Sequence, residues 1–463
     1  MSDAMTVGIV GGGASGVMVA AQLLRAGRVP RVVLIERADA VGQGVAYAPG
    51  PPSLLLNVPA SGMSALPSVP DHFVRWLGAA TGRSDSSTFA PRALYGRYLA
   101  DVLDAAASAS PSTLERVRAD VTAVFRRATG VVVGLRDGRH VEVDACVLAL
   151  GLFPPSPPAG VPRGLLADPR YVADPWEPGA LERVDGDEDV LLLGTGLTAV
   201  DVALMLAERG GTGTVHAASR HGWLPRAHLC TAVEPWPVTF PAAGANGRTA
   251  ADVVRAVRTE LRAAQRAGRD WRSVVDGMRP LTQHVWRSLP DHERVRLLRR
   301  VGRLWEVHRH RMAPPVAATV DHLQAAGRLC VHAGRVGTAR PVGGRISVQL
   351  VGGGGETALL VDRVINCTGP SCDVTRAADP LVRQLLSTGA ARPGPLGLGL
   401  GVDADGALVD TRGNASPDLF TIGSLRKGAL WETTAVPEIA AQAAALADVL
   451  VPAAPRTAQR EAV

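Results

Sequence analysis

The chain has 463 residues, of which 46% are hydrophobic and 20% are charged, so it can build two or three domains with buried cores. This composition excludes a disordered chain and a charged coiled coil. The formal net charge is +6, but the basic residues other than Lys427 are Arg, and they are spread along the chain among 43 acidic residues. We therefore expect no nucleic-acid-binding surface.

Cysteine usage and the apolar N-terminal stretch bear on the cellular location. Five cysteines are an odd number in a long chain, which argues against a disulfide framework and favours a reducing compartment. Residues 4–24 contain no charged side chain, but 11–13 are all glycine and no basic segment precedes them. The sequence therefore predicts neither a signal peptide nor a membrane span, and we expect a cytoplasmic protein.

The first predicted elements are an apolar strand at residues 6–10, a Gly-rich turn and a helix. The turn places Gly11, Gly13 and Gly16 in the pattern G-x-G-x-x-G, and the next apolar strand ends at Glu36. In a dinucleotide-binding fold, these glycines permit a tight turn, close approach of a diphosphate and close packing of the helix. The helix N-terminus then faces the phosphates, while the acidic residue binds a ribose diol. We expect FAD at this turn.

The same pattern recurs in the middle of the chain, after an apolar strand at residues 189–193. Here the turn places Gly194 and Gly196 in the pattern G-x-G-x-x-A, and a helix and a further strand follow. That strand ends at Ser219 and Arg220 instead of at an acidic residue. A hydroxyl and a guanidinium suit the 2′-phosphate of NADPH, which an acidic residue would repel. We expect NADPH here in preference to NADH.

Three later segments are strands that end in turns of small residues, at 145–151, 363–370 and 419–423. The first two are predicted to carry the chain out of one dinucleotide-binding domain and back into the other. Residues 431–438 precede an Ala-rich helix that ends near residue 451. The N-terminus of this helix can stabilise negative charge on a reduced flavin ring.

We predict an α/β fold with two nested Rossmann-like dinucleotide-binding domains, for FAD and NADP, and a helical insert. The predicted boundaries are residues 1–155 for the first part of the FAD domain, 156–330 for the NADP domain, about 248–312 for the insert within it, 331–450 for the returning part of the FAD domain and 451–463 for a tail.

The helical insert is rich in Arg and Trp, and it is predicted either to shape a substrate pocket or to serve as a packing or dimer element. A helix is predicted to begin near Pro290 and to stop at Pro314, with His308 on its apolar stripe. His308 is the single catalytic candidate, as a general base or a donor near the flavin, although a buried structural histidine fits the same pattern. Arg309 and His310 fall on other faces and are expected to be solvated, as is Arg311.

With these motifs the chain resembles the FAD/NAD(P)-binding protein family, and it is similar to class B flavin monooxygenases, which include N-hydroxylating and Baeyer–Villiger enzymes. The segments that carry the resemblance are residues 8–16, 55–59, 91–99, 173–176, 194–201, 308–312, 366–370 and 431–438. Two features depart from the class B pattern: residues 170–176 lack its F-x-G-x-x-x-H segment, and Gly423 is followed by Ser rather than Asp.

The resemblance implies further site residues around the flavin. Those expected to neighbour the flavin are Asn57, Arg92 and Tyr95, and those expected to line its ring are Trp431, Thr433 and Glu438. No metal site is expected, because the spacing of His221, His228 and Cys230 fits no common zinc pattern.

The first functional hypothesis, which the resemblance supplies, is an NADPH-dependent FAD monooxygenase. It would form a flavin C4a-hydroperoxide from molecular oxygen and transfer oxygen to an amine, a sulfur or a ketone of a small molecule. The alternative is a flavin reductase or dehydrogenase that passes electrons to another acceptor or a partner protein, for which Cys367 and Cys372 have the spacing of a redox pair. A third hypothesis is a cofactor-sensing scaffold without turnover. The substrate and the pathway are left open, and so is a homodimer.

Overall fold

The computed structural model describes residues 5–83, 85–158, 160–241 and 247–451. The first of its two parallel sheets has six strands in the order β16-β17-β7-β1-β2-β3, with β16 antiparallel to β17 and the other pairs parallel. These strands are β1 (Thr6–Val10), β2 (Arg31–Glu36), β3 (Thr113–Arg118), β7 (Ala145–Leu148), β16 (Ala407–Val409) and β17 (Ala415–Thr421).

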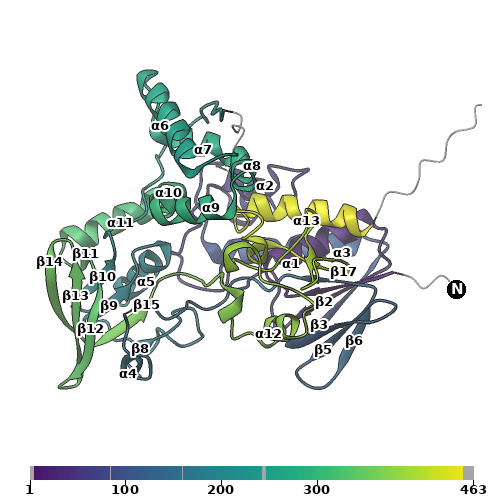
Figure 1. The fold of residues 1–463 in the computed structure, drawn as a ribbon, viewed down its shortest axis with the longest axis horizontal. Coiled ribbons are helices and arrows are strands. Elements are labelled where there is room, and N and C mark those ends of the chain that lie inside the picture. The colour runs from purple at the N-terminus through teal and green to yellow at the C-terminus, as the bar shows by residue number, and fades with distance from the viewer. Residues whose placement is uncertain (1–4, 84, 159, 242–246, 452–463) are drawn as a thin grey trace, which may run out of the picture.

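Both faces of this sheet are covered, which is why its central strands are almost continuously apolar. In β1, Val7 and Ile9 pack against the helical face, whereas Val10 packs against the opposite face. The helical face carries α1 (Ala14–Ala26), α2 (His72–Thr81), α3 (Arg92–Ala109) and α13 (Val436–Leu450). The opposite face carries the antiparallel strands β4 (Val121–Arg126), β5 (Val131–Leu135) and β6 (His140–Val143), with α12 (Pro380–Ser387) beside them. Figure 1 shows α13 and β5–β6 on opposite sides of the sheet.

The second sheet has five parallel strands in the order β11-β10-β9-β15-β8. They are β8 (Tyr171–Val172), β9 (Val190–Leu193), β10 (Val215–Ser219), β11 (Leu329–Ala333) and β15 (Arg363–Asn366). On one face lie α5 (Leu197–Glu208) and α11 (Pro314–Ala325), and on the other lie α4 (Arg163–Leu166) and the antiparallel strands β12 (Arg335–Val342), β13 (Arg345–Gly352) and β14 (Gly355–Val361).

This topology corrects the expected return of the chain to the first domain at residue 331. Strand β11 pairs with β10, and β15 pairs with β9, so both belong to the second sheet. The chain therefore returns to the first domain only after Asn366. This agrees with the crossing predicted at residues 363–370, whereas the boundary at residue 331 was placed too early because a buried parallel strand has the same apolar pattern in either sheet.

The helical insert projects from the second domain above the boundary between the two sheets (Figure 1). It consists of α6 (Ala250–Arg266), α7 (Trp271–Met278), α8 (Thr282–Arg287), α9 (Asp291–Leu297) and α10 (Arg303–Arg309), with a π-helical turn (Leu298–Gly302) between the last two. Thr249 and Asp252 begin α6 with a capping box. No helix in the described ranges combines the length and the apolar character that crossing a bilayer requires.

Candidate functional site

The first Gly-rich turn has the geometry that the sequence predicts. Gly11 has φ +101°, and a Cβ atom built on it would lie 2.3 Å from the carbonyl oxygen of Ala149. A Cβ on Gly16 would lie 1.8 Å from the carbonyl oxygen of Gly11, so only glycine lets α1 pack this close. A Cβ on Gly13 would meet its nearest described neighbour, Gly44, at 3.6 Å. The space above Gly13 is thus open for a diphosphate to approach the backbone.

Two other segments meet this turn. The carboxylate of Glu36, at the end of β2, accepts hydrogen bonds from the backbone nitrogens of Gly12 at 2.6 Å and Ala38 at 2.9 Å. Gly423, which follows β17, has φ +75°, and a Cβ on it would lie 3.0 Å from the hydroxyl of Ser15 in α1. Glu36 and the residue after β17 therefore both lie beside the Gly-rich turn at which the diphosphate would bind. These residues fit a bound FAD.

The second Gly-rich turn repeats this geometry at the end of β9. Gly194 has φ +124°, and a Cβ on it would lie 2.3 Å from the carbonyl oxygen of Cys367. The hydroxyl of Thr195, between the two glycines, is 2.7 Å from the hydroxyl of Ser219 at the end of β10. A Cβ on Gly196 would have no backbone atom of the described residues within 4 Å, so a diphosphate can approach here as well.

Next to Ser219, Arg220 is exposed to solvent, and the rings of His221 and Trp223 are stacked with centroids 4.5 Å apart. A hydroxyl, an exposed guanidinium and a stacking surface together suit a 2′-phosphorylated adenosine. The predicted NADP residues are therefore brought together, and they fit the group.

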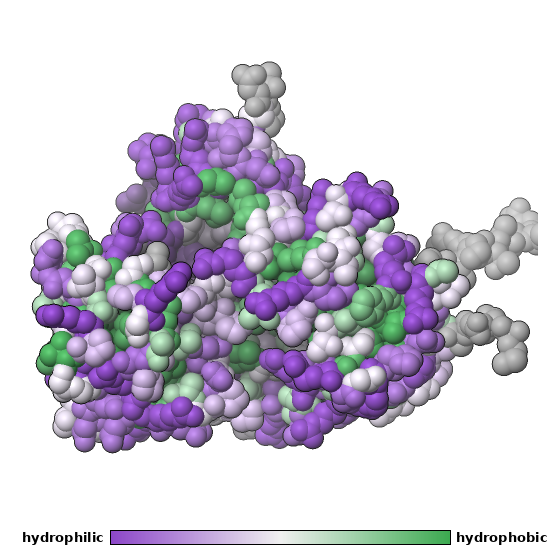
Figure 2. Space-filling model, turned by 60° about the horizontal axis from the view of Figure 1, so that its bottom comes forward, coloured by the Kyte–Doolittle hydropathy of each residue, from purple (hydrophilic) through white to green (hydrophobic). Residues whose placement is uncertain are grey.

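A cleft of about 1260 Å³ lies where the two domains and the insert meet. Figure 2 shows a hollow below the projecting insert, bordered by hydrophobic surface. The cleft is large enough for parts of two cofactors and a small substrate. Its lining comes from the first domain (Tyr47, Asn57, Arg92), from the second turn and its helix (Leu197, Thr198, Asp201), from the insert and its flanks (Asp276, Arg279, 309–311) and from residues 434–436.

Among the three predicted neighbours of the flavin, Asn57 and Arg92 line the cleft, but Tyr95 lies outside it. Tyr95 is fully buried and packs edge-on against Tyr47 and Phe73, with ring centroids 4.7 and 5.0 Å away. Arg92 begins α3, whereas Tyr95 is one turn further along and faces the core. Tyr47, which packs against Tyr95 from the cleft side, is an aromatic residue that sequence analysis missed, and burial raises its pKa to about 12.

Arg92 also joins the two domains. Its guanidinium donates two hydrogen bonds to the Asp201 carboxylate in α5, at 2.7 and 3.0 Å, and a third to the carbonyl oxygen of Leu55 at 3.0 Å. Burial raises the pKa of Asp201, while the charge and hydrogen bonds of Arg92 oppose that rise. This ion pair therefore holds α3 of the first domain against α5 of the second.

The N-terminus of α13 reaches the cleft through residues 434–436. The predicted ring-lining residues lie behind this segment and support it. Thr433 donates a hydrogen bond to the carbonyl oxygen of Gly423 at 2.8 Å, and Glu438 forms a two-pronged ion pair with Arg279 at 2.6 and 2.7 Å. Trp431 packs against Trp286 of the insert, with ring centroids 4.8 Å apart. The expected helix N-terminus is present at the cleft. The residues that line the cleft are 434–436, whereas Trp431, Thr433 and Glu438 do not line it.

The predicted helix begins at Asp291 as expected, but the π-helical turn at Leu298–Gly302 interrupts it, it ends at Arg309, and Pro314 begins α11. A π turn adds a residue and rotates everything after it by about 100°. His308 accordingly lies outside the cleft, where its Nδ1 is 2.8 Å from the carbonyl oxygen of Leu304 and its ring contacts Trp271.

Three residues that were expected in solvent line the cleft instead: Arg309 at the end of α10, and His310 and Arg311 directly after it. Arg309 is 8% exposed and pairs with Glu432 at 3.3 Å, and Arg311 is 3% exposed and pairs with Asp276. Burial, together with the charge of Arg309, lowers the pKa of His310 to about 4, so this ring is neutral near pH 7. The apolar positions Leu298, Val301 and Leu304 keep helical spacing across the π turn, so the sequence pattern gives no signal of it.

Cys367 and Cys372 are both free thiols in the structure. Burial raises the pKa of each thiol, and the carboxylates of Asp201 and Asp174 raise that of Cys367 further. Thiol exchange requires the thiolate, so this environment disfavours a redox pair at these positions.

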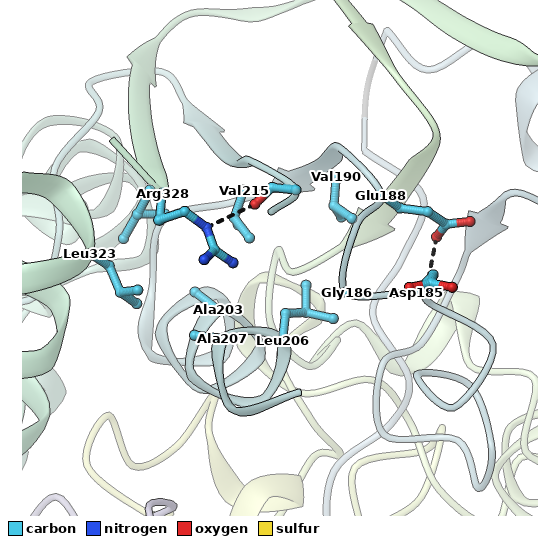
Figure 3. A pocket seen from close by; sticks show the side chains of 12 residues that line it. Asp185, Gly186, Glu188, Val190, Ala203, Leu206, Ala207, Val215, Leu323 and Arg328 are labelled. Carbon is cyan, nitrogen blue, oxygen red and sulfur yellow. Dashed lines mark hydrogen bonds between the residues drawn. The ribbon is translucent and has the colours of Figure 1, made fainter. Parts of the chain in front are cut away.

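A second, much smaller pocket lies at the opposite end of the second sheet (Figure 3). It is lined by Asp185, Glu188 and Arg328 among others, and Arg328 donates to the carbonyl oxygen of Gly213 at 3.1 Å. Its volume of about 10 Å³ is room for one water molecule. It is therefore too small to be a substrate site.

Comparisons with known proteins agree with this architecture. A family model described as FAD-NAD(P)-binding matches residues 8–153. A search of curated protein sequences gave no significant match. Residues 8–153 thus match an FAD/NAD(P)-binding family, the class that the first turn indicates, and they make up the first part of the first domain.

Solved structures resemble nearly the whole chain. An ornithine N-hydroxylase from Kutzneria sp. 744 is 16% identical, with a TM-score of 0.63 and with 96% of this chain and 98% of that chain covered. An FAD-bound cadaverine monooxygenase from Erwinia amylovora is 13% identical, with a TM-score of 0.65 and coverage of 96% and 94%. A bacillithiol disulfide reductase from Bacillus cereus is 15% identical, with a TM-score of 0.51 and coverage of 96% and 98%. The chain has the two-domain fold of these flavoproteins.

Proposed function

We propose that the protein is an FAD- and NADPH-dependent monooxygenase that hydroxylates an amine of a small molecule. The observation that carries the proposal is the shared cleft, which both nucleotide-binding domains line together with the N-terminus of α13. The similarity to ornithine and cadaverine hydroxylases supports an amine as the substrate class. The free thiols of Cys367, which is buried, and Cys372, which is partly buried, have raised pKa values and weigh against the reductase alternative.

The roles of this chain's residues follow from the site. Gly13 and the N-terminus of α1 hold the FAD diphosphate, and Glu36 binds a ribose diol. Ser219 and Arg220 bind the 2′-phosphate of NADPH. When bound, FAD supplies hydride acceptance and the activation of oxygen, and the N-terminus of α13 favours the negative charge that reduction places on the flavin.

The cleft also favours the reactive form of an amine. A nucleophilic amine must be uncharged, and apolar surroundings disfavour its protonated form. Met63 and Phe153 are buried side chains on the cleft wall, and Val436 adds a third at the N-terminus of α13. An amine bound against these side chains has a lowered pKa, whereas the carboxylate of Asp276, which also lines the cleft, favours its charged form.

The proposal is tested by reducing the purified flavoprotein anaerobically with NADPH and then mixing it with oxygen in a stopped-flow instrument. We expect NADPH to reduce the flavin faster than NADH does, and a long-lived absorbance distinct from both oxidised and reduced flavin. A screen of diamines and amino acids should then yield a hydroxylated amine. Immediate return to oxidised flavin with stoichiometric peroxide for every amine would instead support the reductase hypothesis.

His308 and His310 give a matched test of the cleft. His308→Gln is expected to change kcat/KM by less than about twofold, because the side chain lies outside the cleft. His310→Gln is expected to lower kcat/KM about tenfold, because this ring lines the cleft in which the substrate binds. Steady-state kinetics with NADPH and the amine identified in the screen measure both effects. A larger loss for His308→Gln than for His310→Gln would restore His308 as the catalytic candidate.

A further inference from the structure

Arg303, the first residue of α10, lies over the second nucleotide-binding turn. A Cβ built on Gly196 would lie 3.7 Å from its Nη1 and 3.8 Å from its Nη2. Its Nη2 also donates a hydrogen bond to the hydroxyl of Thr195 at 3.4 Å. The guanidinium from the insert therefore stands beside the backbone at which α5 begins.

The π-helical turn puts Arg303 there. Arg299 and Arg300 lie within this turn and are exposed, whereas Arg303 follows it and faces the second domain. The acidic partner of Arg303 is Glu306, 3.7 Å away, and both side chains remain more than a third exposed. Such an exposed pair is weak, so the guanidinium can turn to a better anion.

The chemistry of this position selects a phosphate. The second glycine of the pattern is where a dinucleotide diphosphate comes closest to the backbone, and the positive end of the α5 dipole faces it. Arginine adds a planar pair of donors that match two phosphate oxygens. We propose that Arg303 binds the diphosphate of the nicotinamide cofactor and so couples cofactor binding to the helical insert.

This proposal rests on the proposed NADPH site. In it, Arg220 and Arg303 bind different phosphate groups of the cofactor. Arg220, at the end of β10 beside Ser219, is placed for the 2′-phosphate, which only NADP carries. Arg303, at Gly196, is placed for the diphosphate, which NADP and NAD share. Loss of Arg220 should therefore weaken the binding of NADP alone, whereas loss of Arg303 should weaken the binding of both NADP and NAD.

The test measures binding of NADP⁺ and NAD⁺ to the oxidised, FAD-loaded protein by isothermal titration calorimetry. Arg303→Gln is expected to raise Kd for both cofactors by a similar factor of about 10–100, the loss of a charge-assisted hydrogen bond. Arg220→Gln is expected to raise Kd for NADP⁺ alone. Arg299→Gln, an exposed neighbour in the π turn, is the matched control and should leave both affinities unchanged.

Hydrogen exchange gives a second readout. Saturating NADP⁺ should slow exchange in residues 298–309 of the wild-type protein, and less so in Arg303→Gln. An unchanged Kd in Arg303→Gln, or a loss confined to NADP⁺, would overturn the assignment of Arg303 to the diphosphate. If the wild-type protein binds neither cofactor, the proposed NADPH site itself is wrong. Retention of FAD and an unchanged unfolding midpoint show that the variant is folded.

Discussion

Gly16→Ala is expected to yield a protein that no longer retains FAD. The new methyl group would stand 1.8 Å from the carbonyl oxygen of Gly11, a backbone atom that cannot turn away, and 3.4 Å from the side chain of Ile9. Helix α1 must move off β1, and overpacking of this kind costs about 1–3 kcal/mol or more. The shift also displaces the helix N-terminus from the diphosphate.

The ratio of flavin to protein absorbance after purification, together with the unfolding midpoint, measures this effect. Gly164→Ala in α4 is the matched control, because its Cβ would have no described atom within 4 Å and its φ is not positive. Gly164→Ala should leave both the ratio of flavin to protein absorbance and the unfolding midpoint unchanged. Gly13→Ala separates the effect on folding from the effect on FAD binding. Its Cβ fits among the protein atoms, so the unfolding midpoint should be kept, but it occupies the space through which the diphosphate approaches, so FAD should be lost. Full FAD occupancy in Gly16→Ala would show that the turn does not need close helix packing.

Arg92→Leu is expected to destabilise the protein by about 3–5 kcal/mol at neutral pH, because it leaves the Asp201 carboxylate buried without its partner. The side chain of Asp201 is 8% exposed, so water cannot replace the lost contacts. Asp201→Asn should cost less than Arg92→Leu, since it leaves no buried charge on the α5 side and Arg92 is 20% exposed. Denaturant unfolding of the FAD-loaded protein measures both.

The pH dependence distinguishes this mechanism from simple loss of packing. Burial raises the pKa of Asp201 in the folded protein, and removal of Arg92 raises it further. The penalty for holding its charge is complete above the raised pKa and falls as the carboxyl is protonated below that pKa. It is gone once the pH is below the ordinary pKa of about 3.9. The difference in unfolding free energy between Arg92→Leu and wild type should therefore shrink as the pH falls. A difference that is constant between pH 7 and pH 4 would contradict the buried-charge explanation.

Local sequence determined the two nucleotide-binding turns. Gly11 and Gly194 need a positive φ, and Gly16 needs the absence of a Cβ, so the residues and their spacing impose the same strand–turn–helix wherever they occur. Glu36 and Ser219 follow directly, because each ends the next parallel strand of its sheet. The fold class and the two cofactor sites were predictable for this reason.

Tertiary structure decided what depends on distant contacts. The sheet that β15 joins is set by pairing with β9, which lies far back in the sequence. The orientation of residues 303–309 depends on one extra residue in the π turn, and Arg309 lines the cleft whereas His308 lies outside it. A pattern of apolar residues predicts only that one face of an element is buried. Which element packs against that face depends on how the domains and the insert pack together.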